Sequence, residues 1–131
     1  MKQILILKEP LGAIHSCSDI FDKIKKIKID YDQENLILFS LNTKNQINDA
    51  RVIFKGGLNG CVIDPKTIFR QALLNNACNI IIAHNHPSGD LKPSTEDKKI
   101  YELLTIIGEN LQLNLLDSVI FNKNEYYSMR E

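Results

Sequence analysis

"IIIAHNHPSGDLKPSTED", residues 80–97, places two histidines directly after a short apolar run and directly before a bend rich in proline and glycine. The run "NIIIA", residues 79–83, is β-branched and apolar on both faces, as expected for a central strand covered by helices on both sides. Ser94 has the features of a helix N-cap, because Asp97 follows at the third helical position as in a capping box. This stretch therefore predicts a buried strand, a bend, and a helix that runs to about residue 110.

The sequence before this unit predicts further strands and a helix. A helix capped by Ser16 or Ser18 would run to about residue 28, with apolar side chains turned inward at helical spacing. Two β-rich runs at 34–42 and 47–56, separated by "TKNQ", predict a hairpin. A short strand is also expected at 3–8.

A further helix and two more strands are expected around the histidine segment. Asp64 followed by Pro65 is a good helix start, and the helix would run to about Ala77. The end of the chain reads as a strand, a turn at 122–124 and a last short strand. The helix that begins at Asp64 and Pro65 would bury a face that carries Ile68, Phe69, Ala72 and Leu73. Mixed strands and helices without repeats predict one layered α/β or α+β domain.

Length and composition limit the classes of protein that fit. The 131 residues suit one domain with one core, and 24% charged with 44% hydrophobic residues is ordinary for a soluble globular chain. No apolar stretch approaches the roughly 18 residues that span a bilayer, and the first apolar run is too short for a signal peptide. The cysteines are odd in number and far apart, which argues against a disulfide framework. We therefore expect a cytoplasmic protein with no membrane partner.

The charge balance gives no general support for nucleic-acid binding. Sixteen basic residues balance sixteen acidic ones, so the chain has no overall field to hold a phosphate backbone. The basic cluster "DKIKKIKI", residues 22–29, alternates lysine with isoleucine at helical spacing. That pattern is typical of an amphipathic helix with a solvated outer face, with nucleic-acid binding as the alternative.

The two histidines of the segment can act together. Side chains two residues apart on a strand point to the same side, so His84 and His86 can converge while Asn85 faces away. Pro87 favours extended geometry in the residue before it. Catalytic zinc usually has three protein ligands and a water, and Asp97, one turn into the next helix, can supply the third ligand. The sequence thus indicates a zinc site of His84, His86 and Asp97, one ion per chain.

Structural explanations exist for the same residues. Ser94 and Asp97 are also what a capping box requires, and the two histidines could simply end a strand where it meets solvent. A hydrolytic zinc site usually needs a carboxylate that takes a proton from the bound water. Glu34 is best placed for that role because it begins an apolar strand expected beside the histidine strand. Its alternative is a charged residue at a strand entrance.

The spacing His84, x, His86, Pro87, six residues, Ser94, two residues, Asp97 resembles the JAMM (MPN+) metalloprotease motif at every position. The fuller "AHNHPSGDLKPSTED" is similar to the RadC branch of that family. The likeness continues in "ENLILFSLNTKNQI", "FKGGLNG", "DPKTIFRQALLNNA", "LLDSVIF" and "YYS", over roughly residues 17–129. The resemblance implies a single RadC-like JAB/MPN domain, with a cytidine-deaminase-like α-β-α sandwich and a mixed sheet.

The resemblance also implies roles for the site residues. His84, His86 and Asp97 would bind Zn²⁺, Glu34 would act as general acid and base on the metal-bound water, and Ser94 would hydrogen-bond the tetrahedral intermediate. The expected activity is zinc-dependent hydrolysis of a peptide or isopeptide bond in a peptide or protein substrate.

Two positions depart from the family pattern, and one region of long relatives is not expected. RadC relatives commonly have "LLDH" where this chain has 115–118 ending in Ser118, and a "PRE"-like triplet where it has Pro65, Lys66 and Thr67. The 33 residues before Glu34 leave no room for the helix-hairpin-helix region of long RadC proteins. Two other functions therefore stay open: a DNA-repair-associated role, and a non-enzymatic interaction module that keeps the zinc site.

Overall fold

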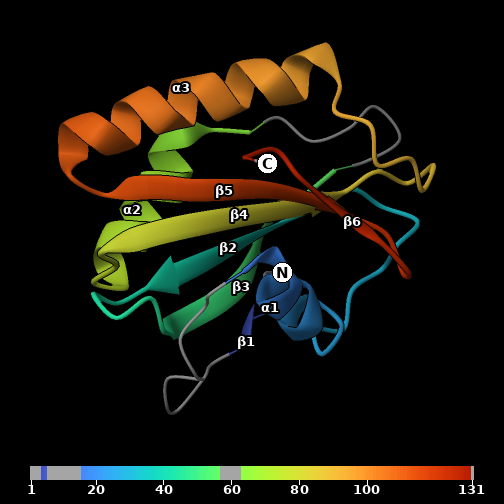
Figure 1. Ribbon diagram of the computed structural model, residues 1–131, viewed down its shortest axis with the longest axis horizontal. Helices are drawn as coiled ribbons and strands as arrows, with labels where there is room; N and C mark the ends of the chain where they lie inside the picture. Colours follow the sequence, from blue (N-terminus) through green and yellow to red (C-terminus); the bar gives the residue numbers. More distant parts are fainter. Residues whose placement is uncertain (1–3, 6–15, 57–62, 131) are drawn as a thin grey trace.

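The computed structural model describes residues 4–5, 16–56 and 63–130 (Figure 1). Its elements are β1 (Ile4–Leu5), α1 (Cys17–Ile24), β2 (Asn35–Leu41), β3 (Ile47–Lys55), α2 (Pro65–Leu74), β4 (Asn79–Asn85), α3 (Thr95–Leu111), β5 (Asn114–Phe121) and β6 (Tyr126–Ser128). Each predicted helix and strand is present. Of the strand expected at 3–8, residues 3 and 6–8 lie outside the described part of the chain.

The strands form a mixed sheet in the order β1-β3-β2-β4-β5-β6, six strands among the described residues. The predicted hairpin is β2 and β3, which pair antiparallel, and β4 lies antiparallel on the other side of β2. β4 and β5 are parallel, so the chain must cross from one end of the sheet to the other between them, and α3 makes that crossing. β4 is therefore an interior strand with a neighbour on each side.

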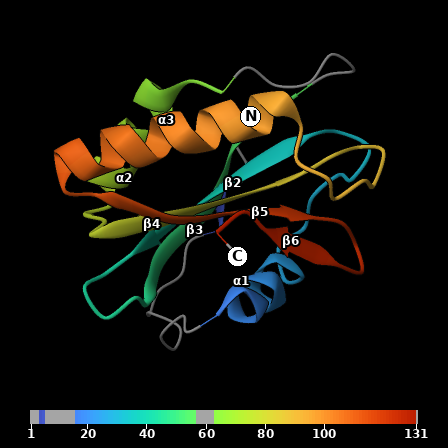
Figure 2. The same cartoon turned by 45° about the horizontal axis from the view of Figure 1, so that its top comes forward.

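Helices cover both faces of the sheet, as Figures 1 and 2 show, with α1 on one side and α2 and α3 on the other. Alternate residues of β2 enter opposite cores: Ile37 and Phe39 pack with α1, whereas Leu36 and Leu38 pack with α2 and α3. β4 divides in the same way, which explains why "NIIIA" has no polar face. The domain is thus an α/β, α-β-α sandwich, as predicted.

α1 and α2 are shorter than the sequence predicted. α1 ends at Ile24 rather than near residue 28, and the following residues form a turn in which Ile27 N–H donates to the Ile24 carbonyl. α2 ends at Leu74 rather than Ala77, because Asn76 takes a left-handed conformation with φ 54° and turns the chain.

The prediction that Leu73 lies on the buried face of α2 was wrong. Leu73 is 58% exposed, whereas Ile68, Phe69 and Ala72 are buried. At 3.6 residues per turn Leu73 is about 100° around the helix from Ala72, and the face that α2 buries is too narrow to include it.

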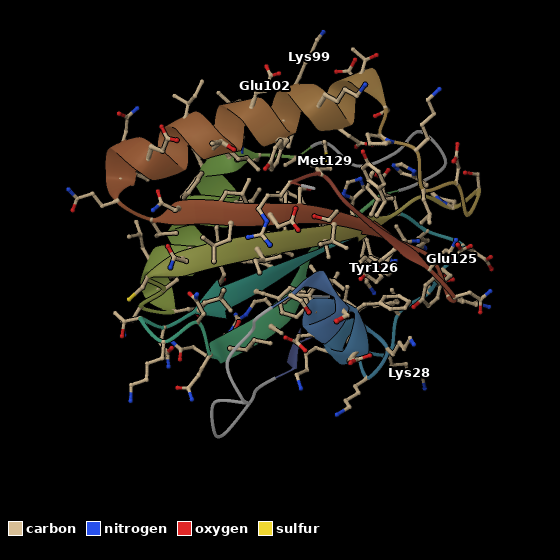
Figure 3. The ribbon with its side chains drawn as sticks, in the orientation of Figure 1. Lys28, Lys99, Glu102, Glu125, Tyr126 and Met129 are labelled. Atoms are coloured by element: carbon tan, nitrogen blue, oxygen red, sulfur yellow. The ribbon has the colours of Figure 1, made fainter. Side chains whose placement is uncertain are left out.

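α3 is amphipathic and starts as the capping box predicted. Ser94 is its N-cap, and the helix ends at Leu111, where Gln112 adopts a left-handed conformation. Leu104 is fully buried against the sheet, while Lys99 and Glu102 point away from it in Figure 3. No helix among the described residues is long and apolar enough to cross a membrane.

Gly108 is the point at which α3 comes closest to the chain that enters β5. A Cβ built on Gly108 would lie 2.5 Å from the carbonyl oxygen of Leu113 and 3.3 Å from the amide nitrogen of Leu115. Both are backbone atoms, so neither can rotate out of the way. The close approach therefore requires a residue without a side chain.

We expect Gly108→Ala to lower the free energy of unfolding by about 2 kcal/mol, because the overlap costs more than alanine's better helix propensity returns. Urea unfolding followed by circular dichroism measures the change. Asn110→Ala, at an exposed position of the same helix, is the control and should be neutral or slightly stabilising. Equal stability of Gly108→Ala and the wild type would contradict the close approach.

Candidate metal centre

β4 brings both histidines to the face of the sheet that α2 and α3 cover. His84 pairs with Leu36 of β2, and paired residues on neighbouring strands point to the same face. His86 follows two residues later, and the two imidazole ring centroids are 5.1 Å apart. Asn85 points to the opposite face, where it is buried and donates to the Gln33 carbonyl. The predicted convergence of the two histidines is confirmed.

The first turn of α3 brings Asp97 to the same point. Its Oδ1 lies 3.1 Å from His84 Nε2, and its Oδ2 lies 3.0 Å from His86 Nε2. The capping box is also present, because Ser94 N–H donates to Asp97 Oδ2 and Asp97 N–H donates to Ser94 Oγ. Figure 1 shows how this is possible: the end of β4 and the start of α3 lie on the same side of the molecule. The carboxylate therefore caps the helix and contacts both histidines at once.

The Glu34 side chain reaches the histidines from the start of the neighbouring strand, β2. It immediately precedes that strand, is half-buried, and its carbonyl accepts from Gly56 N–H. One carboxylate oxygen of Glu34 and one ring nitrogen each of His84 and His86 all lie within 4.8 Å of one another. This spacing would let the three side chains hold a metal ion. The expectation that the Glu34 strand lies beside the histidine strand is confirmed.

The surroundings of the His84 ring suit the binding of a metal ion. Its side chain is only 4% exposed, and within the described part of the chain neither ring nitrogen has a hydrogen-bond partner. The Nε2 contact with Asp97 meets the distance of an ion pair without being a hydrogen bond. Leaving a buried polar group unsatisfied costs about 1–3 kcal/mol. A cation bound to Nε2 would remove that cost for this nitrogen, so the donor set fits a divalent metal.

The ring of His86 is oriented by the bend that follows it. Its Nδ1 lies 2.8 Å from the carbonyl oxygen of Asp90, which can only accept, so Nδ1 carries a proton. Its Nε2 lies 3.0 Å from Asp97 Oδ2, an acceptor when ionised, so Nε2 donates to that carboxylate in the protonated ring. A bound cation would take the place of this Nε2 proton, while Nδ1–H continues to orient the ring. Asn122 in the turn between β5 and β6 supports the bend by donating to the Gly89 carbonyl.

The electrostatics of the cluster favour a cation. The hydrogen bond to Asp97 raises the pKa of His86; burial opposes this, and the charge of Glu34 adds to the increase. Burial on its own would raise the pKa of the Asp97 carboxyl, but His84 and His86 outweigh it and hold that pKa well below its usual range. Asp97 is therefore ionised at neutral pH. Two carboxylates face two imidazoles, a combination that Zn²⁺ and similar divalent ions accept.

The structure thus brings together the side chains that the sequence singled out. His84, His86 and Glu34 form a group that could hold a metal ion, and Asp97 contacts both histidines. The roles of Asp97 as a ligand and of Glu34 and Ser94 in catalysis stay predictions. The role of the Asp90 carbonyl could not be predicted, because a backbone acceptor in a bend has no signature in the side chains.

Comparison with known proteins identifies the family. Residues 14–131 match the RadC-like JAB domain, which is most of the chain. The chain therefore belongs to the RadC-like JAB domain family, within the JAMM/MPN superfamily.

Relatives of the chain carry the name "UPF0758 protein". One from Chlorobium chlorochromatii (strain CaD3) is 42% identical over 124 residues, which cover 95% of this chain and 56% of the relative. One from Clostridium perfringens is 41% identical over 112 residues, covering 86% of this chain and 48% of the relative. One from Chlorobaculum tepidum is 39% identical over 118 residues, 90% of this chain and 53% of the relative. The chain spans about half the length of these relatives.

The departure at Ser118 lies near the cluster but not in it. The register of β4 and β5 shifts at Leu116, so that Ser118 pairs with Ile82 and Ile120 pairs with His84. Ser118 is therefore two residue pairs further into the sheet than His84, and it is buried. A longer polar side chain at this position would approach the histidines from β5.

We expect the purified protein to bind one divalent cation per chain and His84→Ala to abolish that binding, because the variant removes a buried ligand. Metal content by mass spectrometry and Zn²⁺ titration calorimetry measure the effect. Ile80→Ala, buried on the same face of the same strand, is the control: it should lower stability yet keep the metal. Stoichiometric metal in His84→Ala would contradict the site.

Proposed function

We propose that this domain is a zinc-dependent hydrolase that cleaves a peptide or isopeptide bond. The observation that carries the proposal is the meeting of two imidazoles and two carboxylates at one point beside the N-terminus of α3. Family membership supports it, since the motif residues His84, His86, Ser94 and Asp97 occupy this one place.

In the proposed mechanism His84, His86 and Asp97 hold the ion and Glu34 handles the proton. Zn²⁺, when bound, lowers the pKa of a water toward neutrality and polarises the scissile carbonyl. Because Asp97 would serve as the carboxylate ligand, the Glu34 carboxylate, which lies within 4.8 Å of both histidine nitrogens, would be available to accept the proton of that water. Glu34 is half-buried and can later pass this proton to the leaving amine.

Ser94 would stabilise the developing negative charge on the substrate oxygen. Its Oγ accepts from Asp97 N–H, which leaves the hydroxyl hydrogen free to donate elsewhere. The residue stands at the N-terminus of α3, where the helix dipole favours negative charge. Capping and catalysis are therefore compatible in one side chain.

We propose a peptide or protein substrate rather than a nucleic acid, because acidic and basic residues balance. A non-enzymatic module that keeps the metal is the second candidate. The observation that favours it is buried Ser118, which stands in place of the family's common histidine two residue pairs from His84.

Glu34→Gln should reduce hydrolysis about a hundredfold or more, because the amide cannot accept the proton. At saturating Zn²⁺ the variant should still contain one ion per chain. Cleavage of a fluorogenic peptide library by the Zn²⁺-loaded protein, analysed by mass spectrometry, measures the rate.

Glu96→Gln, the same change at an exposed position in the first turn of α3, is the matched control and should leave the rate unchanged. If Glu34→Gln cleaves as fast as the wild type, Glu34 is not the base. If the Zn²⁺-loaded wild type cleaves nothing in the library or in folded isopeptide-linked substrates, the module is the better description.

A further inference from the structure

Asn85 stands between the two histidines in sequence but takes no part in the proposed reaction. Its side chain is fully buried on the face of the sheet opposite to the metal centre. Its Oδ1 accepts from Asn35 N–H at 2.8 Å, and its Nδ2 donates to the Gln33 carbonyl at 2.8 Å. These two groups belong to the two peptide bonds on either side of Glu34. One side-chain amide therefore holds the backbone of Glu34 at both ends.

The side-chain amide of Asn85 makes the hydrogen bonds that a further backbone pair between β2 and β4 would otherwise make. The pairing of β2 with β4 ends at Leu36 and His84. One further step would place Asn35 opposite Asn85, and a second would place Glu34 opposite His86. At this point the Asn35 N–H bonds to the side chain of Asn85. Beyond the last backbone pair, Asn85 thus continues the connection between the two strands.

Other contacts complete the attachment of Glu34. On the β3 side its carbonyl accepts from Gly56 N–H at 2.8 Å. The side-chain amide of Asn35 donates to the Gln33 and Asp30 carbonyls in the segment before β2. The same Nδ2 lies 3.2 Å from Asn85 Oδ1 on β4. The orientation of the Asn85 amide follows from its partners, since a peptide N–H requires an acceptor and a carbonyl requires a donor. The asparagine amide offers both, whereas an ionised aspartate of the same length offers only acceptors.

We infer that Asn85 is a positioning residue that fixes the Glu34 carboxylate relative to His84 and His86. The catalytic value of this positioning rests on the proposed function. The position of the Glu34 carboxylate can be measured without any activity. Because Asn85 is the last residue of β4 and lies between the two histidines, any movement of the strand end carries the histidines and the Glu34 backbone together. Displacements of about 1 Å can cost a reaction a hundredfold, so such coupling matters for a base acting on a bound water.

Asn85→Asp is the test, because it keeps the shape and the acceptor but replaces the group that donates to Gln33 with a second oxygen. We expect Co²⁺ affinity, measured by titration of the visible absorption bands, to fall about tenfold, as for loss of an outer-shell partner. Asn75→Asp is the matched control. It makes the same change in an amide that donates to Ser40 and Asp49 at the other end of β2, and it should leave Co²⁺ affinity unchanged.

A double-mutant cycle with Glu34→Gln separates positioning from a general structural effect. If Asn85 acts through Glu34, Asn85→Asp should change Co²⁺ affinity less than twofold in the Glu34→Gln background. An equal loss in both backgrounds, an equal loss in Asn75→Asp, or no loss in Asn85→Asp would each overturn the inference.

Crystal structures give a readout that needs neither metal nor substrate. In Asn85→Asp the Glu34 carboxylate should move away from the imidazoles by about 1 Å or more, the displacement at which positioning matters. If that variant does not fold, Asn35→Ala removes the other amide on the Gln33 carbonyl and should cause a smaller shift of the same kind. An unmoved Glu34 would refute positioning even in a hydrolase, and a moved Glu34 in a protein without hydrolysis would support positioning while the proposed function fails.

Discussion

The burial of β4 between two helical layers is the constraint on which the rest of the structure depends. Its apolar residues fill both cores, so the strand cannot shift by one residue without moving each side chain to the wrong face. The same fixed register decides that His84 faces α3 and Asn85 faces α1. The chemistry at the strand end is therefore set by packing further back along the strand.

Much of the architecture could be predicted because the signals were local. The apolar runs of β2 and β4, the Asp64–Pro65 start of α2 and the capping box of α3 each depend on residues close in sequence. Errors arose where tertiary packing decides: the width of the face that α2 buries left Leu73 exposed, and the left-handed Asn76 ended that helix early. The register shift at Leu116 likewise has no local signature.

The candidate site divides in the same way. Two histidines at strand spacing and a carboxylate one helical turn after a cap could be found by pattern, and Glu34 by its place before a strand expected next to them. The function of Asn85 could not be found, because its partner Asn35 lies 50 residues away in the chain. A polar residue that faces away from a site gives no sign in the sequence of what it binds.

The close approach of Gly108 gives α3 a mechanical role. The helix is seated on the chain entering β5 near its C-terminal end, and it presents Asp97 at the other end, eleven residues away or about 16 Å of helix. The contact at Gly108 therefore lies far from the helix end that carries Asp97, and buried Leu104 packs against the sheet between them. If α3 tilted by about 5° about Gly108, the Asp97 carboxylate would move by about 1.4 Å over that length. The geometry of the candidate metal centre would then depend on packing contacts that lie far from it.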